Sequence, residues 1–300
     1  MTDTTTTVAL IGAGAMGQAI GTRLLECGVT LRVYDRNPPK VATLADKGAT
    51  GCASAREAGE GADVILTSLN SAAAVRETVL GGDGAAIDVS DGALVIDMSS
   101  IDPASTRALA EDAAARGLRW VDSPLSGGAP KALKGTMTLM LGGTEADCAE
   151  ARARVLDHLG ANVTRMGPSG AGQGTKLINQ VLCGLHFVAA AEATALAEDA
   201  GIDAALVPRA LKGGRADSAI LQEFMPRMAA RDYERTGRID NMVKDLNGAL
   251  DLARATHTPL PLTALAAEIH RMLTAAGWGG EDQAALMEFF RGPDEARRPG

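Results

Sequence analysis

The amino-acid sequence predicts an α/β fold in two parts: a doubly wound, mainly parallel sheet, then an all-helical half. Short apolar runs alternate with amphipathic segments in the first part, and each run ends in polar or glycine residues. After Gly167 only helical periodicity remains. The 300 residues suffice for two ordinary domains, which we expect at 1–167 and 168–290, with a flexible polar tail at 291–300.

Strands are expected where aliphatic and β-branched residues cluster between turn residues. Their ranges are 8–12, 30–35, 63–69, 93–100, 119–124 and 136–143. Amphipathic stretches such as MGQAIGTRLLECG and PASTRALAEDAAARG lie between them, and ADCAEARARVLDHLG follows as a further helix. Strands and helices in alternation form a parallel sheet that helices cover on both faces.

One long helix is expected from Gly172 to about Ala200, and this helix would join the two domains. Four further segments have a period near 3.6: LVPRALKGG, SAILQEFMPRMAARD, VKDLNGALDLARATH and LTALAAEIHRMLTAAG. This half has many apolar stripes for its size. We therefore expect a homodimer or homotetramer that packs through it.

Composition and charge narrow the class of protein. The chain is 46% hydrophobic and 22% charged, as in soluble globular proteins. A net charge of −8 argues against nucleic acid or an anionic membrane as a partner. The N-terminus, MTDTTTTVALIG, lacks the basic start of a signal peptide, and no stretch has the roughly 18 consecutive apolar residues of a membrane span.

The cysteines Cys27, Cys52, Cys148 and Cys183 are scattered and form no CxxC pair. Such a pattern suits reduced thiols in the cytoplasm better than a disulfide framework or a zinc site. The four histidines show no metal-ligand spacing either. We therefore expect a cytoplasmic protein that has no metal ion.

A glycine turn in VALIGAGAMGQAIGTRLL places Gly12, Gly14 and Gly17 between a strand and a helix. The first glycine permits the tight turn, the second lets a pyrophosphate approach the backbone, and the third packs the helix against the strand. Ala15 and Met16 lie in the same turn, where the helix N-terminus attracts phosphate. A mere turn is the alternative, but this context predicts a Rossmann-type dinucleotide site.

Asp35 ends the second strand about 20 residues after the glycine turn, where a ribose-binding acid belongs. Its carboxylate would accept hydrogen bonds from the ribose hydroxyls and repel a 2′-phosphate, which favours NAD. Arg36 stands beside it and could instead pair with that phosphate. We therefore expect NAD, with NADP possible.

A second glycine pair follows the strand that ends in VDSP. Ser126, Gly127 and Gly128 offer a hydroxyl and accessible backbone N–H groups, which could form a nest for a carboxylate. A flexible turn is the alternative. Lys131 and Lys134 could add positive charge, or they could be solvated surface lysines.

Lys176 enters the long apolar helix in GAGQGTKLINQ, where a charge without a purpose would be costly. The spacing differs from that of a Walker loop, so we exclude phosphoryl transfer. Lys176, Asn179, Gln180 and Cys183 share one helical stripe. A lysine with amides one turn away can hold and protonate a carbonyl oxygen, as hydride transfer to a carbonyl requires. A surface lysine is the alternative.

Lys244 precedes Asp245 in a later helical segment. If it approached Lys176, repulsion between the two ammonium groups would lower the pKa of Lys176 toward neutrality. A surface pair of Lys244 with Asp245 is the other interpretation.

Four motifs in order, GAGAMG, DSPLSGG, GAGQGTKLINQ and KDL, resemble those of the β-hydroxyacid dehydrogenase family. The resemblance runs from about Val8 to Phe290. The segments YDRNP, IDMSSI, SGGAPKALKGT, RIDNMVKDLNGALD and LPLTALAAEIH look most like the tartronate semialdehyde reductases of that family.

The resemblance implies that Lys176 is the catalytic acid and base. The groups that hold the substrate carboxylate and hydroxyl would be Ser126, Gly127, Gly128, Asn179 and Gln180. The residues that border the nicotinamide end of the cofactor would be Leu69, Asn70, Ser100 and Lys244. Gln180 stands where many relatives carry asparagine, which puts the choice of substrate in doubt. Ser100 replaces a threonine common in relatives and keeps the hydroxyl.

The function implied is NAD(P)-dependent interconversion of a small 3-hydroxy acid and its semialdehyde, with tartronate semialdehyde as the best fit. The substrate would be a small carboxylate. Alternatives within this chemistry are 3-hydroxyisobutyrate, L-threonate and 4-hydroxybutyrate. A methyltransferase would leave Lys176 and the long helix without a role. A non-catalytic dinucleotide-binding module would be expected to lose Lys176 or the carboxylate nest, and this chain keeps both.

Overall fold

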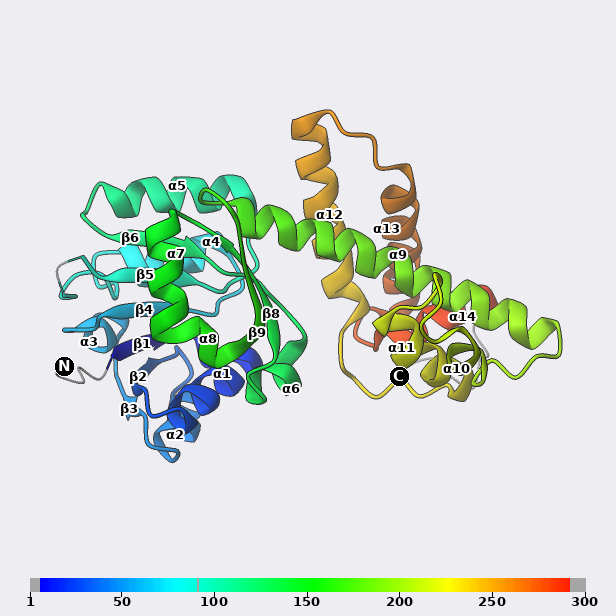
Figure 1. Cartoon of the computed structure of the whole chain (residues 1–300), viewed down its shortest axis with the longest axis horizontal. Coiled ribbons are helices and arrows are strands. Elements are labelled where there is room, and N and C mark those ends of the chain that lie inside the picture. Colours follow the sequence, from blue (N-terminus) through cyan, green and yellow to red (C-terminus); the bar gives the residue numbers. More distant parts are fainter. Residues whose placement is uncertain (1–5, 91, 292–300) are drawn as a thin grey trace. The chain divides into compact units, whose positions relative to one another are not determined.

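The computed structural model of the chain describes residues 6–90 and 92–291 (Figure 1). The described residues form two compact units, which divide between Lys176 and Leu177, inside the long helix α9 (Ala171–Asp199). Each unit is described by itself below. The predicted flexible tail, 291–300, lies outside the described residues apart from position 291.

The first unit contains, within the described residues, one nine-stranded sheet in the order β3-β2-β1-β4-β5-β6-β8-β7, with β9 paired to β8. Its strands are β1 (Thr7–Ile11), β2 (Thr30–Tyr34), β3 (Thr50–Gly51), β4 (Val64–Thr67), β5 (Leu94–Asp97), β6 (Arg119–Asp122), β7 (Leu125–Ser126), β8 (Met137–Gly142) and β9 (Gly160–Gly167). The strands from β1 to β6 pair in parallel, β8 is antiparallel to β6 and β7, and β9 is parallel to β8. The predicted mainly parallel, doubly wound sheet is confirmed.

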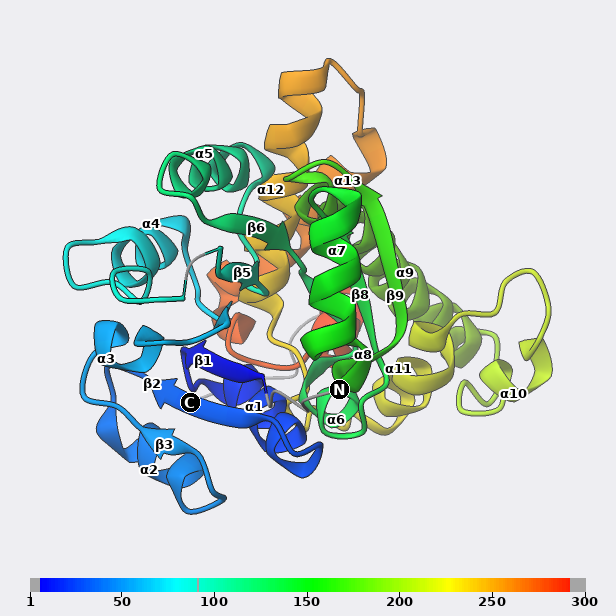
Figure 2. The same ribbon diagram turned by 60° about the vertical axis from the view of Figure 1, so that its left-hand side comes forward.

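Helices cover both faces of this sheet, with α4 and α5 on one side of β5 and β6 and α7 on the other (Figure 2). The helical elements are α1 (Ala15–Glu26), α2 (Pro38–Ala45), α3 (Ala55–Gly59), α4 (Ala72–Val75), η1 (Arg76–Leu80), α5 (Pro103–Ala114), α6 (Gly128–Leu133), α7 (Glu145–Ala151), η2 (Arg152–Leu156) and α8 (Asp157–Leu159). Successive strand residues point to opposite faces. Thus Val8 and Leu10 join one core, and Ala9 and Ile11 join the other.

Strand β9 is the main element that the sequence did not predict. It is an edge strand, and most of its residues are exposed or half-buried, with Val163 packed against the core. An edge strand that buries little shows little apolar alternation. The two-residue strands β3 and β7 are too short to give a pattern.

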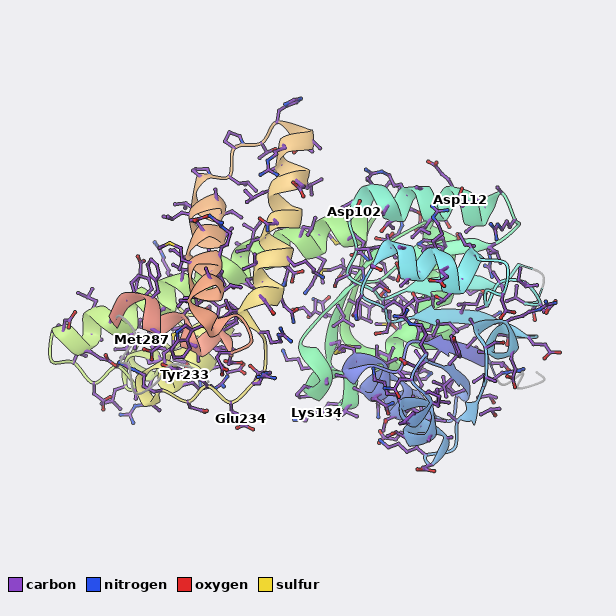
Figure 3. The ribbon with its side chains drawn as sticks, turned by 180° about the vertical axis from the view of Figure 1, so that it is seen from behind. Asp102, Asp112, Lys134, Tyr233, Glu234 and Met287 are labelled. Carbon is purple, nitrogen blue, oxygen red and sulfur yellow. The ribbon has the colours of Figure 1, made fainter. Side chains whose placement is uncertain are left out.

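The second unit is helical, as predicted, throughout its described regular elements. Besides α9 these are α10 (Val207–Leu211), α11 (Ala219–Ala230), α12 (Ile239–Thr256), α13 (Pro261–Leu273), η3 (Thr274–Trp278), η4 (Gln283–Leu286) and α14 (Met287–Arg291). Phe187 of α9 packs edge-to-face on Phe224 of α11, with ring centroids 4.7 Å apart. Tyr233, labelled in Figure 3, packs edge-on against Trp278 and donates its hydroxyl proton to Glu288.

Among the described residues, helix α9 alone has the length and mean hydropathy of a membrane span. The sequence nevertheless has no run of about 18 consecutive apolar residues. The core helix of a soluble protein meets the same criterion. In α9 the side chains of Phe187, Ala190 and Ala191 lie in the core of the second unit. The apolar character of α9 is therefore explained in part by packing within that unit.

Candidate active site

The glycine turn after β1 requires glycine at two positions and leaves open space at the third. Gly12 has φ +100°, and a Cβ there would overlap the carbonyl oxygen of Ser68. A Cβ on Gly17 would overlap the carbonyl oxygen of Gly12, so α1 can approach β1 only with glycine at this place. A Cβ added to Gly14, in contrast, would meet no other described residue within 4 Å. Gly14 caps α1 without a side chain, so open space stands before the N-terminus of α1.

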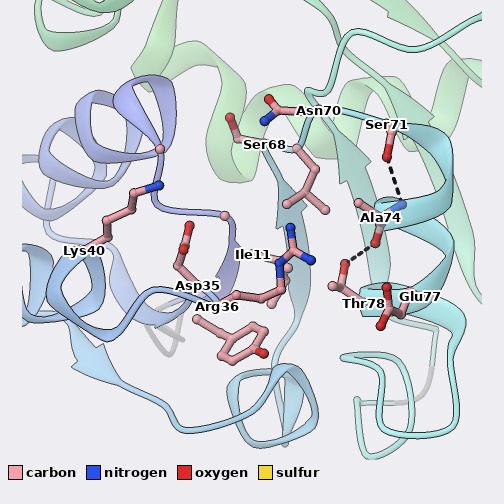
Figure 4. A pocket seen from close by; sticks show the side chains of 14 residues that line it. Ile11, Asp35, Arg36, Lys40, Ser68, Asn70, Ser71, Ala74, Glu77 and Thr78 are labelled. Carbon is pink, nitrogen blue, oxygen red and sulfur yellow. Dashed lines mark hydrogen bonds between the residues drawn. The ribbon is translucent and has the colours of Figure 1, made fainter.

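A pocket lies at the same edge of the sheet, as Figure 4 shows. It brings together six of the predicted cofactor residues: Gly12, Gly14, Asp35, Arg36, Leu69 and Asn70. The hydrogen bonds from Ala74 to Ser71 and from Thr78 to Ala74 hold the α4 side of the pocket. Open space at a helix N-terminus beside a fixed acid fits the pyrophosphate and ribose of a dinucleotide.

Asp35 is fixed by the backbone on both of its carboxylate oxygens. Oδ2 accepts from the N–H of Ala13 and Oδ1 accepts from the N–H of Asn37, each at 2.8 Å. The first of these bonds ties β2 to the glycine turn. Arg36 and Lys40 are exposed and also line the pocket. Lys40 was not predicted, and its place in the helix after β2 gave no signal for it.

Five predicted cofactor residues do not line this pocket. Ala15 and Met16 begin α1, and Gly17 is buried beneath the turn. Ser100 is exposed after β5. Lys244 belongs to the second unit. Their predicted contacts with a cofactor stay predictions.

Ser99, rather than Ser100, holds the segment that follows β4. Its Oγ accepts from the N–H of Leu69 at 3.0 Å, and its backbone oxygen accepts from Gln173 Nε2 at 2.6 Å. Ser99 therefore links the pocket wall to the first turns of α9. The sequence gave no reason to choose it over its neighbour.

Helix α9 starts against the carboxyl edge of the sheet. Asp122, the last residue of β6, accepts from the N–H of Gly170 at 2.7 Å and from the N–H of Gln173 at 2.9 Å. A Cβ on Gly172 would overlap the carbonyl oxygen of Met140, so glycine lets the helix lie this close to the strands. These contacts fix the turn that precedes Lys176, which is half-buried.

Two buried carboxyl groups lie beneath this turn. Asp97 and Asp122 are register partners on neighbouring strands. The pKa of Asp122 is raised to about 6, mainly by burial and to a smaller extent by the charge of Asp97, against the N–H groups of Gly170 and Gln173, which lower it. Burial also raises the pKa of Asp97, against the hydrogen bonds from Ser99 and Thr67. Sequence spacing could not show that these acids meet.

The predicted carboxylate nest has two consecutive glycines with positive φ, +119° at Gly127 and +66° at Gly128. Both glycines are exposed, and Ser126 is half-buried. The aliphatic part of Lys131 packs against Gly127, where a Cβ would lie 2.5 Å from its Cδ. Lys134 is exposed at the end of α6 (Figure 3).

The amides of the Lys176 stripe belong to a hydrogen-bonded chain in the second unit. Asn179 Nδ2 donates to Gln180 Oε1 at 2.8 Å, and Gln180 Nε2 donates to Asp245 Oδ2 at 2.5 Å. The other oxygen of Asp245 lies 3.5 Å from Lys244 Nζ. Lys244 has 58% of its side chain exposed, and its predicted approach to Lys176 stays a prediction.

The described part of the chain shows neither a group of metal-ligand side chains nor a disulfide bond. No group of three or more His, Cys, Asp or Glu side chains there is arranged to hold a metal ion. None of the four cysteines, all within the described ranges, forms a disulfide bond.

Two family models together match nearly the whole chain. Residues 7–167 match the NAD binding domain of 6-phosphogluconate dehydrogenase. Residues 170–290 match a model described as NAD-binding of NADP-dependent 3-hydroxyisobutyrate dehydrogenase. The chain belongs to the β-hydroxyacid dehydrogenase family. This dehydrogenase is an oxidoreductase with NAD(P) as its cofactor, as its sequence predicted.

Relatives that are named for different substrates align with almost the whole length of this dehydrogenase. L-threonate dehydrogenase of Cupriavidus necator is 36% identical over 286 residues, which is 95% of this chain and 96% of the relative. NAD-dependent L-serine dehydrogenase of Pseudomonas aeruginosa is 33% identical, over 94% of this chain and 97% of the relative. The crystal structure of 3-hydroxyisobutyrate dehydrogenase from Salmonella typhimurium has a TM-score of 0.83 and 35% identity, over 94% of this chain and 99% of that one.

Proposed function

We propose that this dehydrogenase interconverts a small 3-hydroxy acid and its semialdehyde, with tartronate semialdehyde and glycerate as the best pair. The main support is the position of Lys176. It follows a helix start that Asp122 holds at the carboxyl edge of the sheet. The glycine turn and the Leu69–Asn70 segment follow other strands at that same edge. Ligands of parallel α/β sheets bind at this edge.

In the proposed mechanism, the bound nicotinamide supplies the hydride for reduction and accepts it in oxidation. Lys176 Nζ donates a proton to the carbonyl oxygen as the carbon below it is reduced, and in oxidation it removes the proton from the hydroxyl. The backbone N–H groups of Gly127 and Gly128, with the Ser126 hydroxyl, hold the carboxylate. Fixing the carboxylate orients the reacting carbon, which is where much of the rate should originate.

A panel of acids tests this proposal. Purified protein is mixed with NAD or NADP and glycerate, 3-hydroxyisobutyrate, L-threonate, L-serine or 4-hydroxybutyrate, and the absorbance of the reduced nicotinamide is followed. The reverse reaction uses tartronate semialdehyde with NADH or NADPH. Glycerate and tartronate semialdehyde are expected to give the highest kcat/KM. Absence of turnover with every acid and both cofactors would contradict the proposal and favour a non-catalytic module.

We propose NAD as the preferred cofactor, because Ala13 and Asn37 hold the Asp35 carboxylate at the pocket. Replacing Asp35 with alanine is expected to raise KM for NAD about 10- to 100-fold, since a hydrogen bond to a charged group contributes about 1.5–3 kcal/mol. The same change should lower the preference for NAD over NADP. Steady-state kinetics with both cofactors measures this.

The matched control is Arg36→Ala in the same segment, which should leave KM for NAD within about twofold and weaken NADP. An unchanged cofactor preference in the Asp35 variant would assign that preference to another group.

We also propose that this dehydrogenase forms a homodimer or homotetramer through α9. Exposed residues recur there at spacings of three and four, along one face of the helix. They are Ile178, Leu182, His186, Ala189, Glu192 and Leu196. Leu182 is 52% exposed and Leu196 is 70% exposed, although both are large and apolar. An exposed helix face that carries several large apolar side chains is typical of a protein interface.

A double Leu182→Glu, Leu196→Glu variant is expected to convert the oligomer to a monomer, because charges on an apolar interface lose their hydration when it closes. Light scattering after size exclusion gives the mass. The control is Leu262→Glu on α13, which is 66% exposed in the native chain and lies off this face. A wild-type monomer, or a double variant that keeps its mass, would exclude this interface.

A further inference from the structure

Two glycines let α12 approach α9 closely in the second unit. Leu246 of α12 packs against Gly184, where a Cβ would lie 2.9 Å from Leu246 Cδ2. In the same way, Leu177 of α9 packs against Gly248 of α12, where a Cβ would lie 3.3 Å from Leu177 Cδ2. Gln180 lies between the two contacts along α9, so its side chain reaches Asp245.

Asp245 gives the hydrogen-bonded chain its direction. A carboxylate can only accept hydrogen bonds, so the end of the Gln180 amide that faces it must be the NH₂ group. The carbonyl end, Oε1, then accepts from Asn179 Nδ2. Lys244 Nζ lies 3.5 Å from the other carboxylate oxygen of Asp245.

The orientation of Asn179 follows from that direction. Nδ2 has two hydrogens, of which one meets Gln180 Oε1 and the other meets Cys183 Sγ at 3.5 Å. Its remaining polar atom is the carbonyl oxygen, Oδ1, which can only accept. Asn179 follows Lys176 by one turn on the same face of α9. That face therefore offers an ammonium donor and then a carbonyl acceptor.

We propose that Asp245 is a positioning residue that makes Asn179 present its carbonyl oxygen, and that this dehydrogenase consequently selects acids with a hydrogen-bond donor on the carbon next to the one oxidised. The proposal rests on the function proposed above and narrows its substrate class. It assigns the hydrogen bond with that second donor to Asn179 Oδ1.

The candidate acids differ in the group on the carbon next to the one that is oxidised. Glycerate carries a hydroxyl on the carbon next to its reacting CH₂OH group, and L-serine carries an ammonium there. In 3-hydroxyisobutyrate the same carbon carries a methyl group, which is similar in size to the hydroxyl but donates nothing. A site built to bond a hydroxyl discriminates strongly against an analogue without it, because its buried acceptor is left unpaired.

The first test compares glycerate with 3-hydroxyisobutyrate, each as the enantiomer that gives the higher rate. The wild-type dehydrogenase with its cofactor is expected to prefer glycerate by about tenfold or more in kcat/KM. The variant Asp245→Asn keeps the size of the side chain, but its amide can face Gln180 with either end. It should lower kcat/KM for glycerate about tenfold and for 3-hydroxyisobutyrate by less than about twofold.

The control is Asp251→Asn, the same change on the same helix. Asp251 pairs with Arg254 on the surface and is 73% exposed. This variant should leave both rates unchanged. A double change of Asp245→Asn with Asn179→Leu should cost glycerate no more than Asn179→Leu alone, because the two residues act through one contact.

Each result bears on the proposal. A wild-type preference for the methyl acid would overturn it, and so would equal losses for both acids in Asp245→Asn, which indicate a structural role alone. If no acid is turned over, the proposed function fails. Calorimetric binding of the same two acids to the Lys176→Ala protein with bound cofactor then decides the selectivity separately: tighter binding of glycerate supports it, and equal binding overturns it.

Discussion

Replacing Lys176 with alanine is expected to lower kcat by about 10³–10⁴-fold, the upper part of the range that a positioned proton donor contributes. Cofactor affinity should stay within about twofold, because the dinucleotide pocket is lined by residues that follow β1, β2 and β4. Stopped-flow measurement of the hydride-transfer step and calorimetric titration with NAD separate the two effects.

The control for this variant is Lys134→Ala, which removes an exposed lysine of the same unit from the end of α6. It should keep full activity. A small primary amine added to the Lys176→Ala protein should restore part of the rate, since it supplies a proton donor to the vacated space. A Lys176→Ala enzyme with normal kcat would show that another group transfers the proton.

The second large effect concerns the pH dependence of stability at Asp122. Its pKa is about 6 in the folded chain, against an ordinary value of 3.8. A carboxyl with a raised folded pKa contributes stability that is fully present below its unfolded pKa and is lost as pH rises through the folded pKa. The free energy of unfolding should therefore lose about 2.4 kcal/mol from this group between pH 4 and pH 7, at about 1.4 kcal/mol per unit of pKa, because a small part of the contribution is already lost at pH 4.

Urea unfolding of the wild type and of Asp122→Asn at a series of pH values measures this contribution, because asparagine does not titrate. The difference in free energy of unfolding between the two proteins should shift against the wild type by about 2.4 kcal/mol from pH 4 to pH 7. A difference that does not change with pH would mean that the carboxyl titrates alike in the folded and unfolded chains.

Asp102 supplies a control, because its contribution to the free energy of unfolding should change with pH in the opposite direction. Burial alone would raise the pKa of this carboxyl, but the hydrogen bonds from Ser105 and nearby backbone N–H groups outweigh it and lower the pKa. Its contribution is present above the unfolded pKa and is lost as pH falls. The difference in free energy of unfolding between wild type and Asp102→Asn should therefore change with pH in the direction opposite to that found with Asp122→Asn.

The features predicted from sequence are those that a short segment specifies. Six strands show apolar runs because both faces of the sheet are covered, and Gly12, Gly14 and Gly17 form their turn within a few residues. The long helix α9 shows its period over 29 residues. Each of these patterns depends on neighbours in the chain, so a single sequence reveals it.

The features that were not predicted depend on contacts between distant residues. Asp122 bonds to an N–H group 48 residues later, and Gln180 bonds to an acid 65 residues later. The close approach of the α9 start to β6 and β8 at Gly172, and the packing of α9 on α12, bring these groups together. The two aspartates at the ends of neighbouring strands were visible in the sequence, but their spacing gave no reason to pair them.

The division of the chain between Lys176 and Leu177 has a consequence for how this family diversifies. Lys176, the proposed proton donor, belongs to the part that is anchored on the sheet, whereas Asn179, Gln180 and Asp245 belong to the helical part. If the two proposals hold, substitutions beyond position 177 alter which acid is accepted and leave Lys176 and the cofactor pocket unchanged.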